Sequence, residues 1–167
     1  MNNRKVYISG EIIPEVDAKI SIFDSAVLLG DTVTESTRTF NFKPFKLDEH
    51  LERLYKSFKL TRIDPQMTIE EMKKVSLELL EINKDNYKAN EDCWLVHNIS
   101  RGHSITGGNP ALQVSKPTVM IYTQPMNLVL WAPFYTKGCH AVTPPTRMVP
   151  SQSLDARIKN RSRLFYT

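Results

Sequence analysis

Two amphipathic helices, set between segments rich in β-branched residues, most constrain how this chain can fold. The first is predicted over EHLERLYKSFKL, where Asp48 stands at the expected N-cap. Its apolar residues recur at helical spacing, at Leu47, Leu51, Leu54 and Phe58. The second begins with a capping box, Thr68 with Glu71, and continues with apolar Ile69, Met72, Val75, Leu79 and Leu80. With the neighbouring strands, the two apolar stripes can build the core of one domain.

Strands are predicted on both sides of these helices. Short extended segments bounded by turn residues come first, at Lys5–Ile8, Glu11–Ile13, Ile20–Phe23 and Thr32–Phe40. After the helices come Asp92–Ser100, Thr118–Thr123, Cys139–Thr143 and, conditionally, Ala156–Leu164, with an exposed loop over 101–117. This order predicts an α/β fold class, with an α+β N-terminal domain made of an open sheet and two helices. The first strands of a second domain are expected to follow.

A proline-bracketed segment is predicted to divide the chain into two parts. Pro125 and Pro133 flank it, so we expect an N-terminal domain over 1–124, a linker over 125–134 and the start of a second domain over 135–167. About thirty residues are too few for an independent core. The chain also stops within a patterned segment, and it is therefore expected to be the front part of a longer protein.

Composition excludes several classes of protein. The 167 residues carry 22 Lys and Arg against 18 Asp and Glu, a net charge of +4 that is too mild to indicate a nucleic-acid partner. No apolar run approaches the roughly 18 residues of a membrane span, and the polar start is unlike a secretory signal. Cys93 and Cys139 lack metal or redox spacing. A cytoplasmic protein with neither nucleic-acid nor membrane partners is the expectation.

The basic end of the chain is the first candidate site. If Ala156–Leu164 is a strand, its period of two places four basic side chains on one face, those of Arg157, Lys159, Arg161 and Arg163. This face could be a solvated edge, which the pattern alone favours, or a nucleic-acid patch. It could also hold a reactive lysine, because neighbouring positive charges lower the pKa of an amine and make it a nucleophile.

The first helix provides a second candidate site. His50, Arg53 and Ser57 fall three and four residues apart beside the apolar stripe. An arginine at that border can reach into a cleft, where its planar fork suits a phosphate. Surface ion pairs, Glu49 with Arg53 or Glu52 with Lys56, are the alternative that spacing alone favours.

Other phosphate and metal motifs are absent from the sequence. Gly30-Asp31 is neither a P-loop nor a dinucleotide fingerprint and is read as a turn. No metal site is expected, because the four histidines lack ligand spacing at His50, His97, His103 and His140.

Five segments together resemble the class-IV aminotransferases, the fold-type-IV pyridoxal-phosphate enzymes. They are VYISGEIIPEVDAKISIFD, LLGDTVTES, FKLDEHLERLYKS, SRG and SLDARIKNRSRL, and they occur in the family's order over nearly the whole chain. The family includes branched-chain amino acid aminotransferases, D-amino acid aminotransferases and aminodeoxychorismate lyases. The resemblance therefore implies a fold-type-IV aminotransferase-like structure.

The resemblance also implies site residues. Lys159 matches the lysine that attaches to pyridoxal 5'-phosphate through a Schiff base and later moves the proton. Arg53 matches the arginine that contacts the cofactor phosphate, and Thr34 and Ser36 match the strand that approaches the substrate. Relatives usually have an aromatic residue at the position of Thr34, so the substrate pocket should differ in shape. The second arginine that D-amino acid enzymes have after the RG element is missing after Gly102.

By this resemblance, the expected reaction transfers the amino group of a branched-chain or similar amino acid to 2-oxoglutarate. An aminodeoxychorismate lyase, a D-amino acid aminotransferase, and a non-catalytic fragment or dimerisation module are the alternatives. A homodimer is expected, since the family usually dimerises. Its members draw the acidic partner of the pyridine nitrogen and the amides around the phosphate from residues after the lysine, so the 167-residue chain alone is expected to be inactive.

Overall fold

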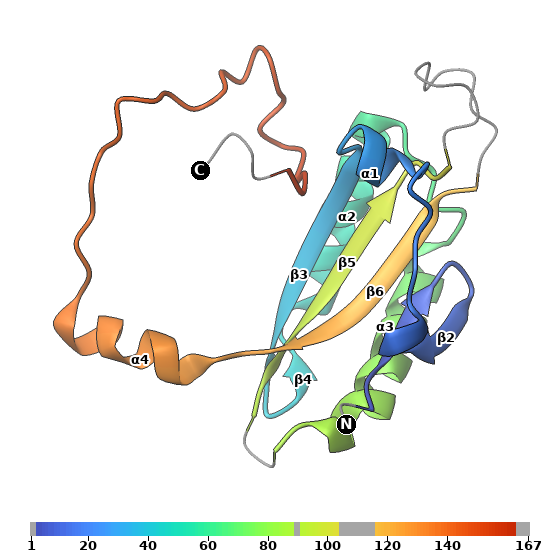
Figure 1. Ribbon diagram of the computed structural model, residues 1–167, viewed down its shortest axis with the longest axis horizontal. Coiled ribbons are helices and arrows are strands. Elements are labelled where there is room, and N and C mark those ends of the chain that lie inside the picture. Colours follow the sequence, from blue (N-terminus) through green and yellow to red (C-terminus); the bar gives the residue numbers. More distant parts are fainter. Residues whose placement is uncertain (1–2, 89–90, 104–115, 163–167) are drawn as a thin grey trace.

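The computed structural model describes residues 3–88, 91–103 and 116–162, and its centre is an open antiparallel sheet with two helices on one face (Figure 1). The strands are β1 (Lys5–Ile8), β2 (Glu11–Pro14), β3 (Thr32–Phe40), β4 (Lys43–Pro44), β5 (Cys93–Ser100) and β6 (Thr118–Pro125). They lie in the order β2-β1-β6-β5-β3-β4. The predicted α+β domain with an open sheet and two helices is confirmed.

The two main helices are α2 (Leu47–Thr61) and α3 (Ile69–Asn83). The predicted capping box of α3 is confirmed, because Thr68 Oγ1 accepts from the Glu71 amide at 3.2 Å and the Glu71 carboxylate accepts from the Thr68 amide at 2.7 Å. The predicted N-cap of α2 is wrong. That helix begins two residues earlier, at Leu47, after Lys46 in a left-handed conformation. Asp48 lies in the first turn, where a carboxylate interacts favourably with the positive end of the helix.

The core lies between these helices and the sheet. The stripe predicted for α2 is buried at all four positions, and Met72, Leu79 and Leu80 of α3 are buried as well. They cover the strand residues Val33, Leu95, Ile99, Val119 and Ile121, all of which are buried. Full burial of such a side chain stabilises the fold by roughly 1.5–3 kcal/mol, so this layer supplies most of the driving force for folding.

Three predicted strands are wrong. Ile20–Phe23 turns instead, with the Asp24 amide donating to Ser21 O at 3.0 Å, and leads into the short helix α1 (Ser25–Leu28). Residues 139–143 form no strand and are exposed, and the described residues give them no neighbouring strand to pair with. Residues 156–162 form turns and one bridge, between Asn160 and Val33. A local preference for extended structure does not make a strand unless another backbone satisfies its polar groups.

The segment between the two predicted domains contains a further helix. Strand β6 continues to Pro125, and α4 (Leu128–Lys137) includes Pro133 and projects away from the sheet (Figure 1). The domain limits at 124 and 134 stay a prediction. Of the predicted loop over 101–117, residues 104–115 lie outside the described part of the chain. No helix within the described ranges is long and apolar enough to cross a membrane.

Asn83 joins the end of α3 to the sheet. Its side chain is buried; Oδ1 accepts from the Lys5 amide at 2.7 Å, and Nδ2 donates to Lys5 O at 2.8 Å and to Thr123 Oγ1 at 3.2 Å. The Asn83→Leu variant keeps the volume but removes these partners. We expect it to lower the free energy of unfolding by about 2–3 kcal/mol, the cost of leaving peptide groups unpaired. Urea unfolding measures this.

Glu81→Leu, at an exposed position of the same helix, is the matched control and should change the free energy of unfolding by less than about 0.5 kcal/mol. Equal stability of the two variants would show that the Asn83 contacts do not hold α3 on the sheet.

Candidate active site

The open edge of β3 positions Lys159. Strand β4 pairs only with the far end of β3, at Thr39 and Phe40, which leaves the beginning of that edge for another segment. The chain returns there after α4 (Figure 1). The Thr34 amide donates to Lys159 O at 2.9 Å, and the Arg161 amide donates to Thr32 O at 3.1 Å. These two bonds place Lys159 beside the first residues of β3.

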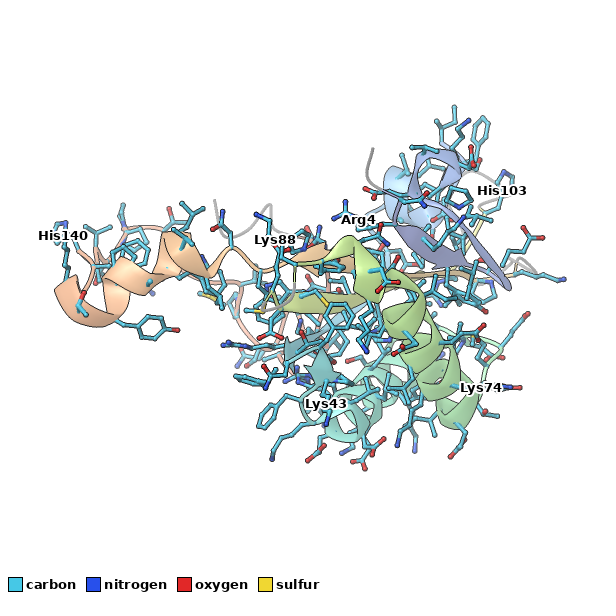
Figure 2. The ribbon with its side chains drawn as sticks, turned by 90° about the horizontal axis from the view of Figure 1, so that it is seen from below. Arg4, Lys43, Lys74, Lys88, His103 and His140 are labelled. Atoms are coloured by element: carbon cyan, nitrogen blue, oxygen red, sulfur yellow. The ribbon has the colours of Figure 1, made fainter. Side chains whose placement is uncertain are left out.

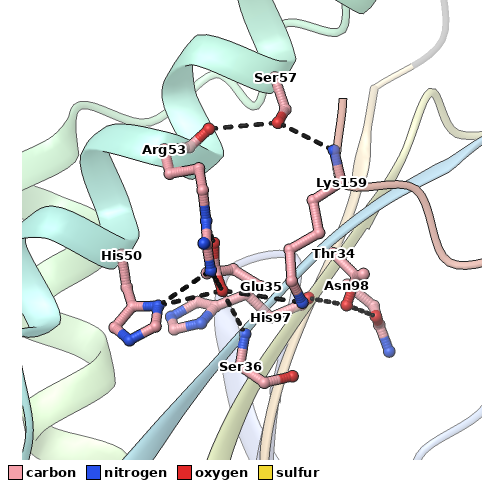
Figure 3. Close-up of polar contacts among 9 residues, drawn as sticks. All are labelled: Thr34, Glu35, Ser36, His50, Arg53, Ser57, His97, Asn98 and Lys159. Atoms are coloured by element: carbon pink, nitrogen blue, oxygen red, sulfur yellow. Dashed lines mark hydrogen bonds and ion pairs between the residues drawn. The ribbon is translucent and has the colours of Figure 1, made fainter. Parts of the chain in front are cut away.

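Helix α2 holds the same segment from the other side. Ser57 is fully buried, and its Oγ donates to Arg53 O at 3.2 Å and accepts from the Lys159 amide at 3.4 Å (Figure 3). The lysine backbone is therefore fixed between the edge of β3 and one turn of α2, and its side chain is 37% exposed.

A polar pocket of about 350 Å³ opens between these elements. Thr34, Arg53 and residues 156–162 line it, so Arg157, Lys159 and Arg161 meet there with Arg53. The predicted strand with four basic residues on one face does not form, yet the turns of 156–162 bring Arg157, Lys159 and Arg161 to one pocket. Arg163 lies outside the described residues. Arg53 is paired with Glu35 and Arg157 with Asp155, so these four cations meet two carboxylates, and the remaining positive charge suits an anionic ligand.

Glu35 is the site residue that the sequence analysis missed. It lies in the middle of β3 with no exposed surface, and it accepts two bonds from Arg53, Nε to Oε2 and Nη2 to Oε1, each 2.7 Å (Figure 3). Its Oε1 also accepts from the Ser36 amide at 2.9 Å and lies 3.1 Å from His50 Nδ1. Lys159 Nζ is 3.8 Å away. A carboxylate among β-branched strand residues was the available signal.

The charge of Glu35 is maintained by these neighbours. Burial by itself raises the pKa of a carboxyl group. The hydrogen bonds from Arg53 and from the Ser36 amide, with the positive charges of Lys159 and Arg53, outweigh it and hold the pKa of Glu35 below its ordinary value. The same bond raises the pKa of Arg53. Both groups are therefore charged at neutral pH.

The two interpretations of Arg53 can now be separated. Its partner is Glu35 rather than Glu49, so it points from α2 toward β3 and the pocket. The other surface pair, Glu52 with Lys56, does form, at 3.8 Å between two exposed side chains. Such a pair contributes little to stability. The structure thus supports the cleft location for Arg53, and its role toward a phosphate stays a prediction.

Thr34 and Ser36 occupy different positions relative to the pocket. Thr34 lines it and is 4% exposed, and its Oγ1 lies 3.0 Å from His97 O and 2.7 Å from Asn98 Oδ1. The hydroxyl proton is therefore directed to β5. Ser36 follows Glu35 and donates its amide to that carboxylate, and it is not among the lining residues.

The histidines do not form a metal site. Figure 2 shows His103 and His140 at opposite ends of the molecule, and within the described ranges no group of three His, Cys, Asp or Glu side chains could hold a metal ion.

His97 is fully buried, with Nε2 2.8 Å from Ser76 Oγ. Because Ser76 donates its proton to Met72 O at 2.7 Å, Nε2 is assigned as the protonated nitrogen.

The sequence from Thr32 onward belongs to a known family. Residues 32–167 match the family described as amino-transferase class IV, and the chain is a member of it. It is 35% identical over 156 residues to the putative branched-chain-amino-acid aminotransferase of Methanocaldococcus jannaschii, covering 93% of this chain and 51% of that protein. The chain thus spans about half the length of that relative.

Solved structures of the family share this fold. The branched-chain amino acid aminotransferase of Escherichia coli superposes with a TM-score of 0.83 at 22% identity, over 95% of this chain and 51% of that chain. The branched-chain amino acid aminotransferase of T.th., complexed with N-(5'-phosphopyridoxyl)-L-glutamate, gives 0.78 at 22% identity, over 95% and 50%. The predicted family and its fold-type-IV architecture are confirmed.

Because His97 is buried, we expect the free energy of unfolding to fall as the pH falls below neutral. Burial, with a smaller contribution from His50, lowers its pKa from 6.5 to about 4 and outweighs the opposing effect of Glu35. Below pH 6.5 the unfolded chain therefore binds a proton that the folded chain does not, and stability falls as the pH falls toward 4. Between pH 7 and pH 5 we expect a loss of about 2 kcal/mol from this group.

Chemical unfolding at several pH values measures this loss. His97→Gln should flatten the dependence between pH 7 and pH 5, whereas His140→Gln, at an exposed position, should keep that of the unsubstituted protein. If all three proteins lost the same free energy, His97 would not be neutral in the folded state.

Proposed function

We propose that this chain forms part of the active site of a pyridoxal-phosphate-dependent aminotransferase. The reaction would transfer the amino group of a branched-chain or similar amino acid to 2-oxoglutarate. The observation that carries the proposal is the meeting of a lysine amine and an arginine fork in one polar pocket, at Lys159 and Arg53. Membership of the class-IV family and the likeness to a putative branched-chain-amino-acid aminotransferase support the reaction type.

The residues of the pocket fit pyridoxal 5'-phosphate. The cofactor needs a cation for its phosphate and an amine within reach of its aldehyde, and the pocket of about 350 Å³ has both. The T.th. relative binds a phosphopyridoxyl compound, which supports the same cofactor here. When bound, the cofactor supplies an aldehyde that condenses with an amine, with loss of water, and a ring that stores electrons from the substrate.

Lys159 would have two tasks in this pocket. Its amine is the attachment point for the aldehyde, and after the substrate amine takes that place, its Nζ can take the proton from the substrate α-carbon and return it to the cofactor. Both tasks require a fixed backbone with a mobile side chain. The bonds from Lys159 to Thr34 and Ser57 fix the backbone, and the side chain extends toward Glu35.

Arg53 would bind the cofactor phosphate. Within the described part of the chain its bonds to Glu35 use Nε and Nη2, and Nη1 remains for another acceptor. Arg157 and Arg161 line the same pocket; the charge of Arg157 is compensated by Asp155, and Arg161 adds positive potential. A guanidinium is suited to this task because it presents N–H groups in a planar fork.

Thr34 and Ser36 would shape the substrate side of the site. Both lie on β3, next to the carboxylate that joins Lys159 and Arg53. We further infer a cytoplasmic homodimer by resemblance to the family. D-amino acid transfer and aminodeoxychorismate lysis use the same cofactor, and the substrate assay below separates them from the branched-chain reaction.

Borohydride reduction tests the site. In the full-length protein incubated with pyridoxal phosphate, reduction should fix the cofactor on the peptide that contains Lys159, as read by mass spectrometry. Lys159→Ala should remove this adduct, because no other amine lies beside Arg53 with the same geometry among the described residues. Lys56→Ala, on the exposed side of α2, is the control. An adduct on a different lysine with Lys159 unmodified would end the assignment.

Conversion of the bound cofactor by single amino acids, the first half of a transamination, tests which substrate the protein prefers. In the full-length protein, leucine, isoleucine or valine should convert bound pyridoxal phosphate to pyridoxamine phosphate, followed by absorbance, and D-alanine should not. Loss of the Lys159 amine should slow the conversion about 10²–10⁴-fold, the range for removal of a positioned acid–base group. Conversion by D-alanine alone would replace the branched-chain proposal with the D-amino acid alternative.

A further inference from the structure

We infer that Glu35 is a positioning residue, which holds the Arg53 guanidinium in one orientation and thereby sets how strongly the pocket binds a phosphate group. The inference rests on the proposed function, since it concerns the phosphate of the same cofactor. Glu35 itself has no exposed surface and would act on the phosphate through Arg53; its other cationic neighbour, Lys159 Nζ at 3.8 Å, faces the aldehyde side of the cofactor in the proposed function.

The contacts make Glu35 a rigid anchor for a mobile side chain. Arg53 is 51% exposed and stands on the surface of α2, where an arginine has many accessible rotamers. Two parallel bonds of 2.7 Å to Glu35 fix the plane of its guanidinium. The carboxylate is itself fixed by the Ser36 amide at 2.9 Å. Ordering a free arginine on binding costs side-chain entropy, and here folding has already ordered it.

The fold alone does not require a carboxylate at this position. Val33 and Thr37 lie on the same face of β3 and are buried, so side chains of that kind satisfy the packing. A buried carboxylate is unfavourable unless it is paired. His97 lies directly opposite on β5 and is neutral, so compensation comes from Arg53 and, at 3.8 Å, from Lys159. The two cations that make the charge tolerable are therefore groups that face the pocket.

Charge and orientation predict opposite effects of removing Glu35. If its negative charge were all that mattered, Glu35→Gln would strengthen phosphate binding, because one repulsive charge is lost. If it orients Arg53, the same variant would weaken binding, because an amide cannot accept both N–H bonds. Glu35→Asp retains the charge but is shorter by one methylene, so it cannot reach Nε and Nη2 in the same geometry.

The experiment compares the affinities of the protein for pyridoxal 5'-phosphate and for pyridoxal, followed by absorbance. The dissociation constant for pyridoxal divided by that for pyridoxal 5'-phosphate isolates the contribution of the phosphate and is independent of a general loss of folding. We expect Glu35→Gln and Glu35→Asp each to reduce this ratio about tenfold, and Arg53→Ala should reduce it to a similar extent. Glu49→Gln, at an exposed position of α2, is the matched control and should leave the ratio unchanged.

A double variant completes the test. If Glu35 acts through Arg53, Glu35→Gln combined with Arg53→Ala should give the ratio of Arg53→Ala alone, because the two changes remove one interaction. A ratio that is unchanged in Glu35→Asp, or that rises in Glu35→Gln, would overturn the inference and leave the proposed function intact. An unsubstituted protein that does not prefer pyridoxal phosphate over pyridoxal would overturn both.

Discussion

The edge of strand β3 is the constraint on which the site depends. Its backbone pairs with β5 along seven residues, from Thr32 to Arg38, and with β4 at its far end. The remaining edge groups accept the segment 159–161. Backbone groups at a partly covered edge need partners, and this segment supplies them. The same pairing that completes the sheet therefore brings Lys159 to Arg53.

The buried carboxylate of Glu35 is the second feature on which the site depends. Glu35 occupies a strand position that faces the helical layer, where an apolar side chain would pack without desolvation cost. The cost is offset by Arg53, which approaches from α2, and by Lys159, which approaches from the edge. One carboxylate thus joins three separate parts of the chain. Stability and function are coupled at this point, because loss of any partner leaves a buried charge less compensated.

The predictions from sequence succeeded where apolar periodicity matched a real interface. Helix α3 begins at its predicted capping box, and β3 has the predicted limits. They failed where extended sequence had no partner. Residues 139–143 lie exposed, and 156–162 pairs only through a single bridge, because strand formation depends on a neighbouring backbone that local sequence does not specify.

By itself, the sequence determined the two main helices α2 and α3, most strands of the sheet and, through resemblance, the two cations Lys159 and Arg53. These follow from residues close together in the chain and from motifs in a known order. Only the tertiary structure decided that Glu35 joins them and that Ser57 fixes the lysine backbone, a contact across 102 residues. Hydrogen bonds and ion pairs between distant segments depend on how the sheet edge and the helix meet, and no local periodicity contains that information.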